Sequence, residues 1–151
     1  MTDVNQSFLK NFNPKPLTKE NILYYYFPLQ SMASYAALSV NVMNPSIAIR
    51  FLPKRDVTNF LLVHTLFGTT LYLYSRPHLA VDPNQRRVAY SVYGSVLFSF
   101  GSILVWAVLR SAIPRNQALA TTLGLSSGLL LAKLTYDYLD SNDKQVVQKK
   151  N

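Results

Sequence analysis

The chain alternates between long uncharged segments and short polar connections. No Asp, Glu, Lys or Arg occurs in residues 21–49, 57–75 or 88–109. At about 1.5 Å of rise per residue, a helix as long as the last segment crosses a hydrocarbon core of roughly 30 Å. This pattern predicts that lipid surrounds at least part of the protein.

Four helices account for these segments. Asp56 is a candidate N-cap for the second helix, and Arg76-Pro77 ends it. We predict an all-α membrane protein with a transmembrane domain over 21–139, in which four helices span the membrane, or three as the alternative. The expected spans are about 22–43, 57–75, 88–110 and 116–138, flanked by a polar N-terminal arm (1–20) and a polar, solvated C-terminal tail (140–151).

The charge pattern supports a membrane location rather than nucleic-acid binding. The formal net charge is +8, but the basic residues gather at segment ends, where they reach lipid headgroups and fix topology. We expect phospholipid headgroups as their partners and no nucleic acid. The candidate headgroup residues are Arg50, Lys54, Arg55, Arg76, Arg86, Arg87, Arg110 and Arg115.

The expected topology places both termini on one side of the membrane. That side carries more Lys and Arg than the other, which favours the cytosol or the mitochondrial matrix. Residues 1–20 lack the apolar core of a secretory signal, and they lack the arginines of a mitochondrial presequence. Any targeting information is therefore expected in the spans.

Small residues form a stripe on the expected last helix. Ala120, Gly124, Gly128 and Ala132 recur every four residues, and 124–128 is a GxxxG sequence. Such a face lets two helix backbones approach closely in lipid. It either docks a partner subunit or packs against helix 57–75 or 88–110 of the same chain, and the tethered neighbour 88–110 slightly favours internal packing.

A second small-residue stripe lies on the expected helix 88–110. It consists of serines with two neighbouring glycines. Serine hydroxyls in helices usually bond to their own i−4 carbonyls, so a close-packed interface is favoured over a polar pathway. The stripe either meets the one on 116–138 or remains available to a partner protein. Its residues are Ser91, Gly94, Ser95, Ser99, Gly101 and Ser102.

His64 is the one histidine in a predicted span. It is a possible haem ligand or proton relay, but a haem between helices needs a second axial ligand. His78, the other histidine, lies in a predicted loop. A neutral histidine hydrogen-bonded to a neighbouring helix is the favoured interpretation.

Catalytic chemistry has no support in the sequence. The predicted spans carry no carboxylate apart from Asp137 at the end of the last one, the chain has no cysteine, and no metal-binding, nucleophile or nucleotide motif occurs. We therefore expect no catalytic residue, no metal site and no cofactor.

The favoured hypothesis is a non-catalytic accessory subunit of a respiratory complex in the mitochondrial inner membrane, with complex I first. Helix packing against other subunits would stabilise assembly. A free-standing assembly factor or scaffold of the ER or another membrane is the alternative, and a small carrier or haem protein using His64 is a third possibility.

Overall fold

The computed structural model describes residues 14–51, 57–113 and 116–149. Every regular element in these ranges is a helix, which confirms the all-α prediction for the described residues. The elements are α2 (Lys19–Asn21), the π-helix η1 (Ile22–Tyr26), α3 (Phe27–Met43), α4 (Pro45–Phe51), α5 (Val57–Tyr74), α6 (Asn84–Ala112) and α7 (Gln117–Gln148).

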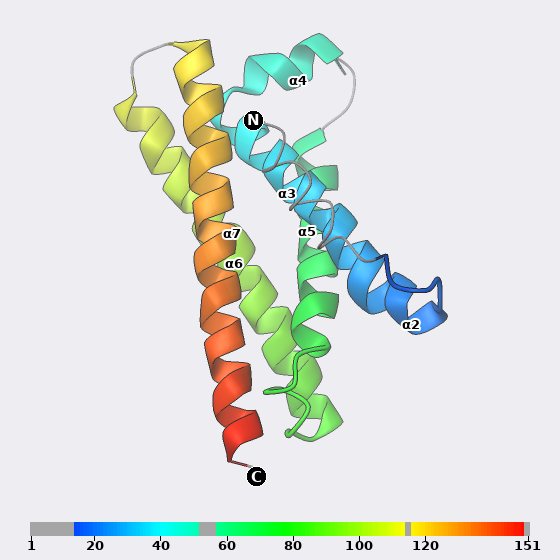
Figure 1. Ribbon diagram of the computed structural model, residues 1–151. Helices are drawn as coiled ribbons and strands as arrows, with labels where there is room; N and C mark the ends of the chain where they lie inside the picture. The colour runs from blue at the N-terminus through cyan, green and yellow to red at the C-terminus, as the bar shows by residue number, and fades with distance from the viewer. Residues whose placement is uncertain (1–13, 52–56, 114–115, 150–151) are drawn as a thin grey trace, which may run out of the picture.

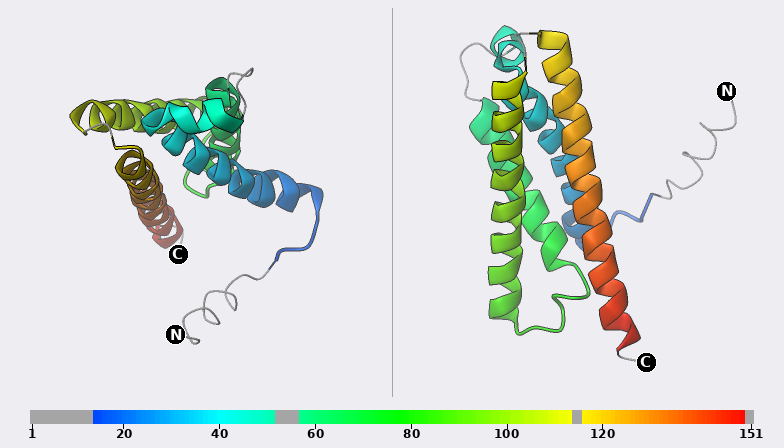
Figure 2. Two further views of the ribbon diagram at one scale, coloured as in Figure 1. Left: turned by 90° about the horizontal axis from the view of Figure 1, so that it is seen from above. Right: turned by 90° about the vertical axis from the view of Figure 1, so that its left-hand side faces the viewer.

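Four long helices run alternately in opposite directions along the molecule (Figure 1). The end with α4 and the start of α7 is called the α4 end here, and the end with the loop 75–83 is called the loop end. Views from two further sides show that α7 crosses α3 near the α4 end and diverges from α6 toward its own C-terminus (Figure 2).

The first helix begins and ends at residues that the sequence explains. The Thr18 side chain accepts a hydrogen bond from the backbone N–H of Asn21. The π-helical turn stands directly before Pro28, whose ring would clash with the carbonyl four residues earlier in a regular α-helix. Asn44 then leaves helical geometry, and Pro45 begins α4.

The last helix is longer than the sequence analysis predicted. α7 continues to Gln148, whereas the expected span ended at 138 and a solvated tail was expected from 140. On this extension Asp140 and Lys144, four residues apart, form an ion pair at 2.7 Å. Such spacing stabilises a helix, and polarity alone had suggested a tail.

The core is small and lies where α3, α6 and α7 meet. Tyr35, Leu38, Met43 and Trp106 form one buried cluster. The Tyr35 ring packs on Trp106 at a centroid distance of 5.1 Å and on Phe98 at 4.9 Å. The Tyr35 hydroxyl also donates a hydrogen bond to Ser102 Oγ at 2.9 Å, which fixes the register of α3 against α6.

Two helices, α6 and α7, are long and apolar enough to cross a membrane. Only 22% of the most apolar window of α6 and 11% of that of α7 is buried inside the protein. Most of their apolar surface is therefore not covered by the rest of the described chain.

Candidate functional site

The small-residue stripe on α7 packs inside the protein. A Cβ added at Gly124 would lie 2.9 Å from the Ser39 carbonyl oxygen, and one at Gly128 would lie 3.2 Å from Ser39 Cβ. The main partner is therefore α3, and Trp106 of α6 adds a contact near Gly128. Internal packing was the slightly favoured prediction. Of its expected partners, helix 88–110 contributes Trp106 here, helix 57–75 is not among the nearest neighbours of either glycine, and α3 was not predicted.

The other two stripe residues extend this contact. Ala120 and Ala132 are partly buried and pack against the same core cluster. α6 and α7 also touch. The alternative that the small-residue stripes of these two helices pack against each other is wrong, because the α7 glycines face mainly α3. The first helix was the missed partner because its own small residues, such as Ser39, follow no regular four-residue spacing.

The serine stripe on α6 is also an internal interface. Ser91, Ser95, Ser99 and Ser102 are all buried. Ser91 and Ser102 donate to the carbonyls four residues earlier, at 2.7 Å each, as predicted. Ser95 instead donates to the Leu66 carbonyl of α5, also at 2.7 Å, and so ties the two helices together.

The two glycines beside this stripe differ. A Cβ at Gly94 would lie 3.0 Å from Leu73 Cδ1, so Gly94 belongs to the α5–α6 interface. Gly101 is exposed, and nothing described lies within 4 Å of an added Cβ. It sits among large exposed side chains of α6, which we call the outer α6 face: Tyr93, Phe100, Leu104 and Val108. This face is available to a partner.

Hydrogen bonds connect α3 and α5 along their length. Asn41 Nδ2 donates to Thr58 Oγ1 at 2.6 Å, and Ser34 Oγ lies 2.8 Å from His64 Nδ1. Farther along, Gly68 and Ser31 are so close that a Cβ added at Gly68 would overlap Ser31 Oγ. Of these residues, only His64 was a candidate for a functional role from its sequence context.

His64 makes the contact that the favoured interpretation predicts. Besides Ser34, it packs against Phe27 at a ring distance of 5.0 Å and stacks on Phe60 at 6.1 Å. Its Nδ1 is therefore occupied by a neighbouring helix. Within the described residues, no group of three or more His, Cys, Asp or Glu side chains is placed to hold a metal ion.

A polar cluster joins the loop end to α7. Arg76 Nε lies 2.8 Å from Asp143 Oδ2, and both side chains are largely buried, with 14% and 12% exposed. Asp143 Oδ1 accepts from the backbone N–H of His78 at 3.0 Å, and His78 Nδ1 lies 2.6 Å from it. We call these three residues the polar latch. Sequence spacing gave no indication of it.

The other predicted headgroup residues lie at helix ends. Arg87 donates to the Tyr74 carbonyl from Nε at 2.7 Å, and its guanidinium lies 4.0 Å from the centroid of the Tyr74 ring. Arg86 is exposed beside it, and Arg50 and Arg110 are exposed at the α4 end. Lys54, Arg55 and Arg115 lie outside the described residues. Arg76 is the exception, since the latch has buried it.

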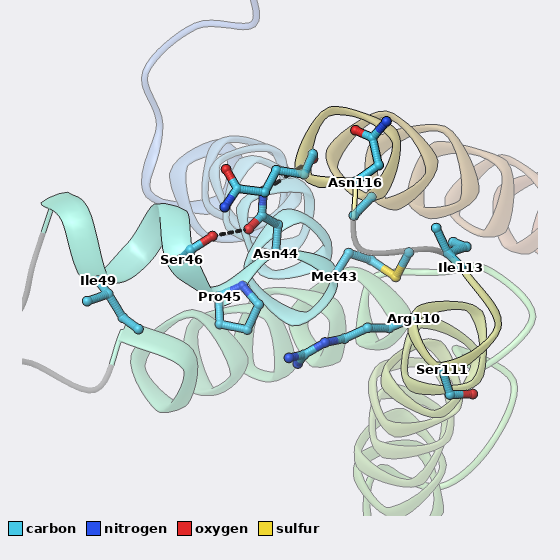
Figure 3. A pocket seen from close by; sticks show the side chains of 11 residues that line it. Met43, Asn44, Pro45, Ser46, Ile49, Arg110, Ser111, Ile113 and Asn116 are labelled. Atoms are coloured by element: carbon cyan, nitrogen blue, oxygen red, sulfur yellow. Dashed lines mark hydrogen bonds between the residues drawn. The ribbon is translucent and has the colours of Figure 1, made fainter.

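A pocket of about 550 Å³ opens at the α4 end, between the α3–α4 corner and the ends of α6 and α7 (Figure 3). Asn44 is buried at its edge and donates to the Gln117 carbonyl and to Thr121 Oγ1 of α7. Arg110 extends its side chain into the pocket and donates to the Val42 carbonyl at 3.3 Å. The pocket is wide open and carries no group suited to acid–base chemistry.

An apolar groove of about 390 Å³ lies nearer the loop end. It forms where α7 diverges from α3, with α5 and α6 beneath. Its walls include Leu29, Met32, Leu97, Phe98 and Leu139, with Tyr72 and Tyr136 among its aromatic residues.

Comparisons with models of protein families, with curated proteins and with solved structures found no match. The surfaces and cavities described above therefore carry the functional argument alone.

Proposed function

We propose that this chain is an integral membrane protein whose four long helices all lie in the bilayer, and that it acts as a non-catalytic accessory subunit of a larger membrane complex. The distribution of polarity supports the proposal. Serine, threonine and asparagine are prominent among the buried side chains of the described residues, whereas large apolar side chains cover the outside. Small and hydroxylated residues at interfaces are typical of helices that associate in lipid.

The shorter helices support membrane insertion of all four. α5 has 18 residues, about 27 Å of helix, and exposes Phe60, Val63 and Phe67 on one side. The segment α2–η1–α3 runs without a break from Lys19 to Met43 and exposes Leu29 and Met32. These faces carry large exposed apolar side chains, as α6 and α7 do, which supports the proposal that all four helices share one solvent.

The outer α6 face supports a role in assembly. Gly101 is an open backbone position next to Phe100 and within one turn of Leu104, both large and exposed. A partner helix can approach closely at such a position. We propose respiratory complex I of the mitochondrial inner membrane as the larger complex. The chain is small, basic and free of cysteine and of catalytic motifs, as expected of an accessory subunit.

Native electrophoresis of mildly solubilised membranes tests this proposal. The tagged chain is expected to comigrate with one large complex at fixed stoichiometry, and Gly101→Leu is expected to release it while the variant stays membrane-bound. Val147→Leu, which changes an exposed residue near the end of α7, is the control and should still comigrate.

Two outcomes would redirect the proposal. Migration of the wild-type chain alone, with fractionation to the ER, would favour the alternative of a free-standing scaffold. A Soret band in the purified protein would favour a haem site at His64, although Ser34 occupies its Nδ1 in the structure.

A further inference from the structure

We propose that the apolar groove binds one acyl chain of a phospholipid and that the ester region of the same lipid accepts hydrogen bonds from the Tyr72 hydroxyl and from Arg76 Nη2. This inference rests on the proposed membrane location. It adds a specific lipid site to a surface that otherwise contacts lipid without selectivity.

The groove offers an acyl chain a continuous apolar lining. Carbon atoms of Pro28, Met32, Gly68, Leu97 and Leu139 contribute to it from all four long helices. Two of its hydroxyl groups are already satisfied, because Ser31 donates to the Pro28 carbonyl and Thr69 to the Thr65 carbonyl. A hydrocarbon chain therefore meets few unpaired polar atoms along the groove.

The size of the groove favours a single chain over a partner helix. A helix is about 10–12 Å across, so one 5.4 Å turn occupies roughly 420 Å³ or more. The groove volume of about 390 Å³ is no larger than one such turn. A slender acyl chain can lie along it, whereas a helix would have to stay outside.

Two buried polar groups without a partner in the described part of the chain lie beside the groove, one on the lining residue Tyr72 and one on Arg76, which packs against lining tyrosines. The Tyr72 hydroxyl and Arg76 Nη2 are buried, and neither has a hydrogen-bond partner among the described residues. The Arg76 guanidinium lies 5.0 Å from the centroid of the Tyr72 ring and 5.6 Å from that of Tyr136, two residues that line the groove.

These donors match the chemistry of a lipid. Buried donors without an acceptor are costly and call for an oxygen that the protein itself does not supply. Arg76 forms an ion pair with Asp143 through Nε, and Nη2 has no partner among the described residues, so Nη2 can donate to a neutral ester carbonyl. An apolar groove with two unpaired donors beside it has the polarity order of a phospholipid.

Native mass spectrometry of the full chain tests the site. The protein is purified in mild detergent, incubated with dioleoylphosphatidylcholine and exchanged into lipid-free detergent. We expect the wild type to retain one phospholipid per chain. Met32→Trp, which fills the groove, should reduce the retained lipid at least about tenfold, as should Leu29→Trp, a second variant in case the first folds poorly. Leu104→Trp, on the outer α6 face, is the matched control and should retain the lipid.

Tyr72→Phe tests the polar end of the groove. Loss of one hydrogen bond should reduce lipid retention about fivefold, and Tyr93→Phe, an exposed tyrosine outside the groove, should have no effect. Unchanged retention together with a raised melting temperature would overturn the assignment, because the hydroxyl would then be merely unsatisfied or bound to water.

The remaining outcomes separate this inference from the proposed function. Equal retention in Met32→Trp and Leu104→Trp, or no retained lipid in a wild type that resists carbonate extraction, would overturn the groove site alone. Release of the wild type by carbonate would overturn the membrane location itself.

Discussion

Helix α3 has two long interfaces of different construction. Toward α5 it is held along its length by the hydrogen bonds Asn41–Thr58 and Ser34–His64 and by the close contact at Gly68. Toward α7 it is close only at the α4 end, at Gly124 and Gly128, and the two helices then part around the groove.

The difference follows from where small residues stop. On α7 the four-residue repeat continues to Ala132, and the next position in that repeat is Tyr136. Tyr136 is about half exposed and lines the groove, and beyond it the polar latch holds the far end of α7. Close backbone contact thus coincides with the small-residue repeat of α7, and the groove lies where that repeat ends.

The largest loss of stability is expected from substitutions of Gly68. An added Cβ would overlap Ser31 Cβ. Gly68→Leu should therefore prevent normal assembly of α3 on α5, and Gly68→Ala should cost about 2–3 kcal/mol. Gly101→Ala is the matched control on an open helix position and should stabilise by about 0.5–1 kcal/mol. Thermal melts in detergent measure both. A melting temperature unchanged by Gly68→Ala would contradict the view that α3 and α5 are in closer contact along their length than α3 and α7.

The second largest loss of stability is expected at the polar latch. Asp143→Ala removes the partner of a largely buried guanidinium and should destabilise by about 3 kcal/mol. Amide hydrogen exchange should increase mainly in α7 after Ala132 and in the loop 75–83, while the Gly124 region stays protected. Uniform loss of protection would mean that the two ends of the α3–α7 interface are not independent.

A smaller effect is expected in the core. Tyr35→Phe loses the hydrogen bond to Ser102 Oγ but keeps the ring packing, which should cost about 1 kcal/mol. Ser102 keeps its own bond to the Phe98 carbonyl, so no buried hydroxyl is orphaned. The melting temperature measures the change. A loss as large as that of Gly68→Ala would show that this hydrogen bond specifies the fold.

The smallest expected effect is a pH dependence of helix stability at the Asp140–Lys144 pair. The hydrogen bond from Lys144 lowers the pKa of Asp140 and raises that of Lys144, on the part of α7 beyond the expected span. A lowered pKa means that the stabilisation is present above about pH 4, the unfolded value, and is lost as pH falls through the folded pKa. Alkaline pH removes it again as Lys144 deprotonates. The pair is exposed, so its contribution is small.

Asp140→Asn provides the control for this pH dependence. It should remove the slight drop in α7 helicity, measured by circular dichroism, between pH 6 and pH 3. An unchanged drop in the variant would show that the Asp140–Lys144 pair is not its cause.

The sequence predicted the helices better than their contacts. Uncharged segments and Pro or Asn at their borders located the long helices, and the end expected at 43 agrees with α3. Spacing also identified Gly124, Gly128 and Ser95 as packing residues. It could not assign α3 as the main partner of α7, because periodicity describes one helix face and carries no information on the opposing one.

The latch and the groove lay beyond sequence reasoning for a related reason. Arg76 and Asp143 are far apart in the chain, and each alone is typical of a solvated helix end. Gly68 stands alone in its helix without a small-residue repeat, so nothing marked it. The groove arises from the divergence of two helices, which depends on the whole arrangement rather than on any local pattern.

Single-cysteine accessibility tests the central claim most directly, because the chain has no native cysteine. Cysteines at Met32, Val63, Leu104 and Leu129, exposed positions on the four long helices, are treated with a membrane-impermeant maleimide in sealed vesicles before and after opening. Four embedded helices predict no labelling of these sites in either case, while Asn84→Cys and Ser141→Cys label from one side and Ser111→Cys from the other. Labelling of Met32→Cys and Val63→Cys alone would contradict the account, since only α6 and α7 would then cross the membrane.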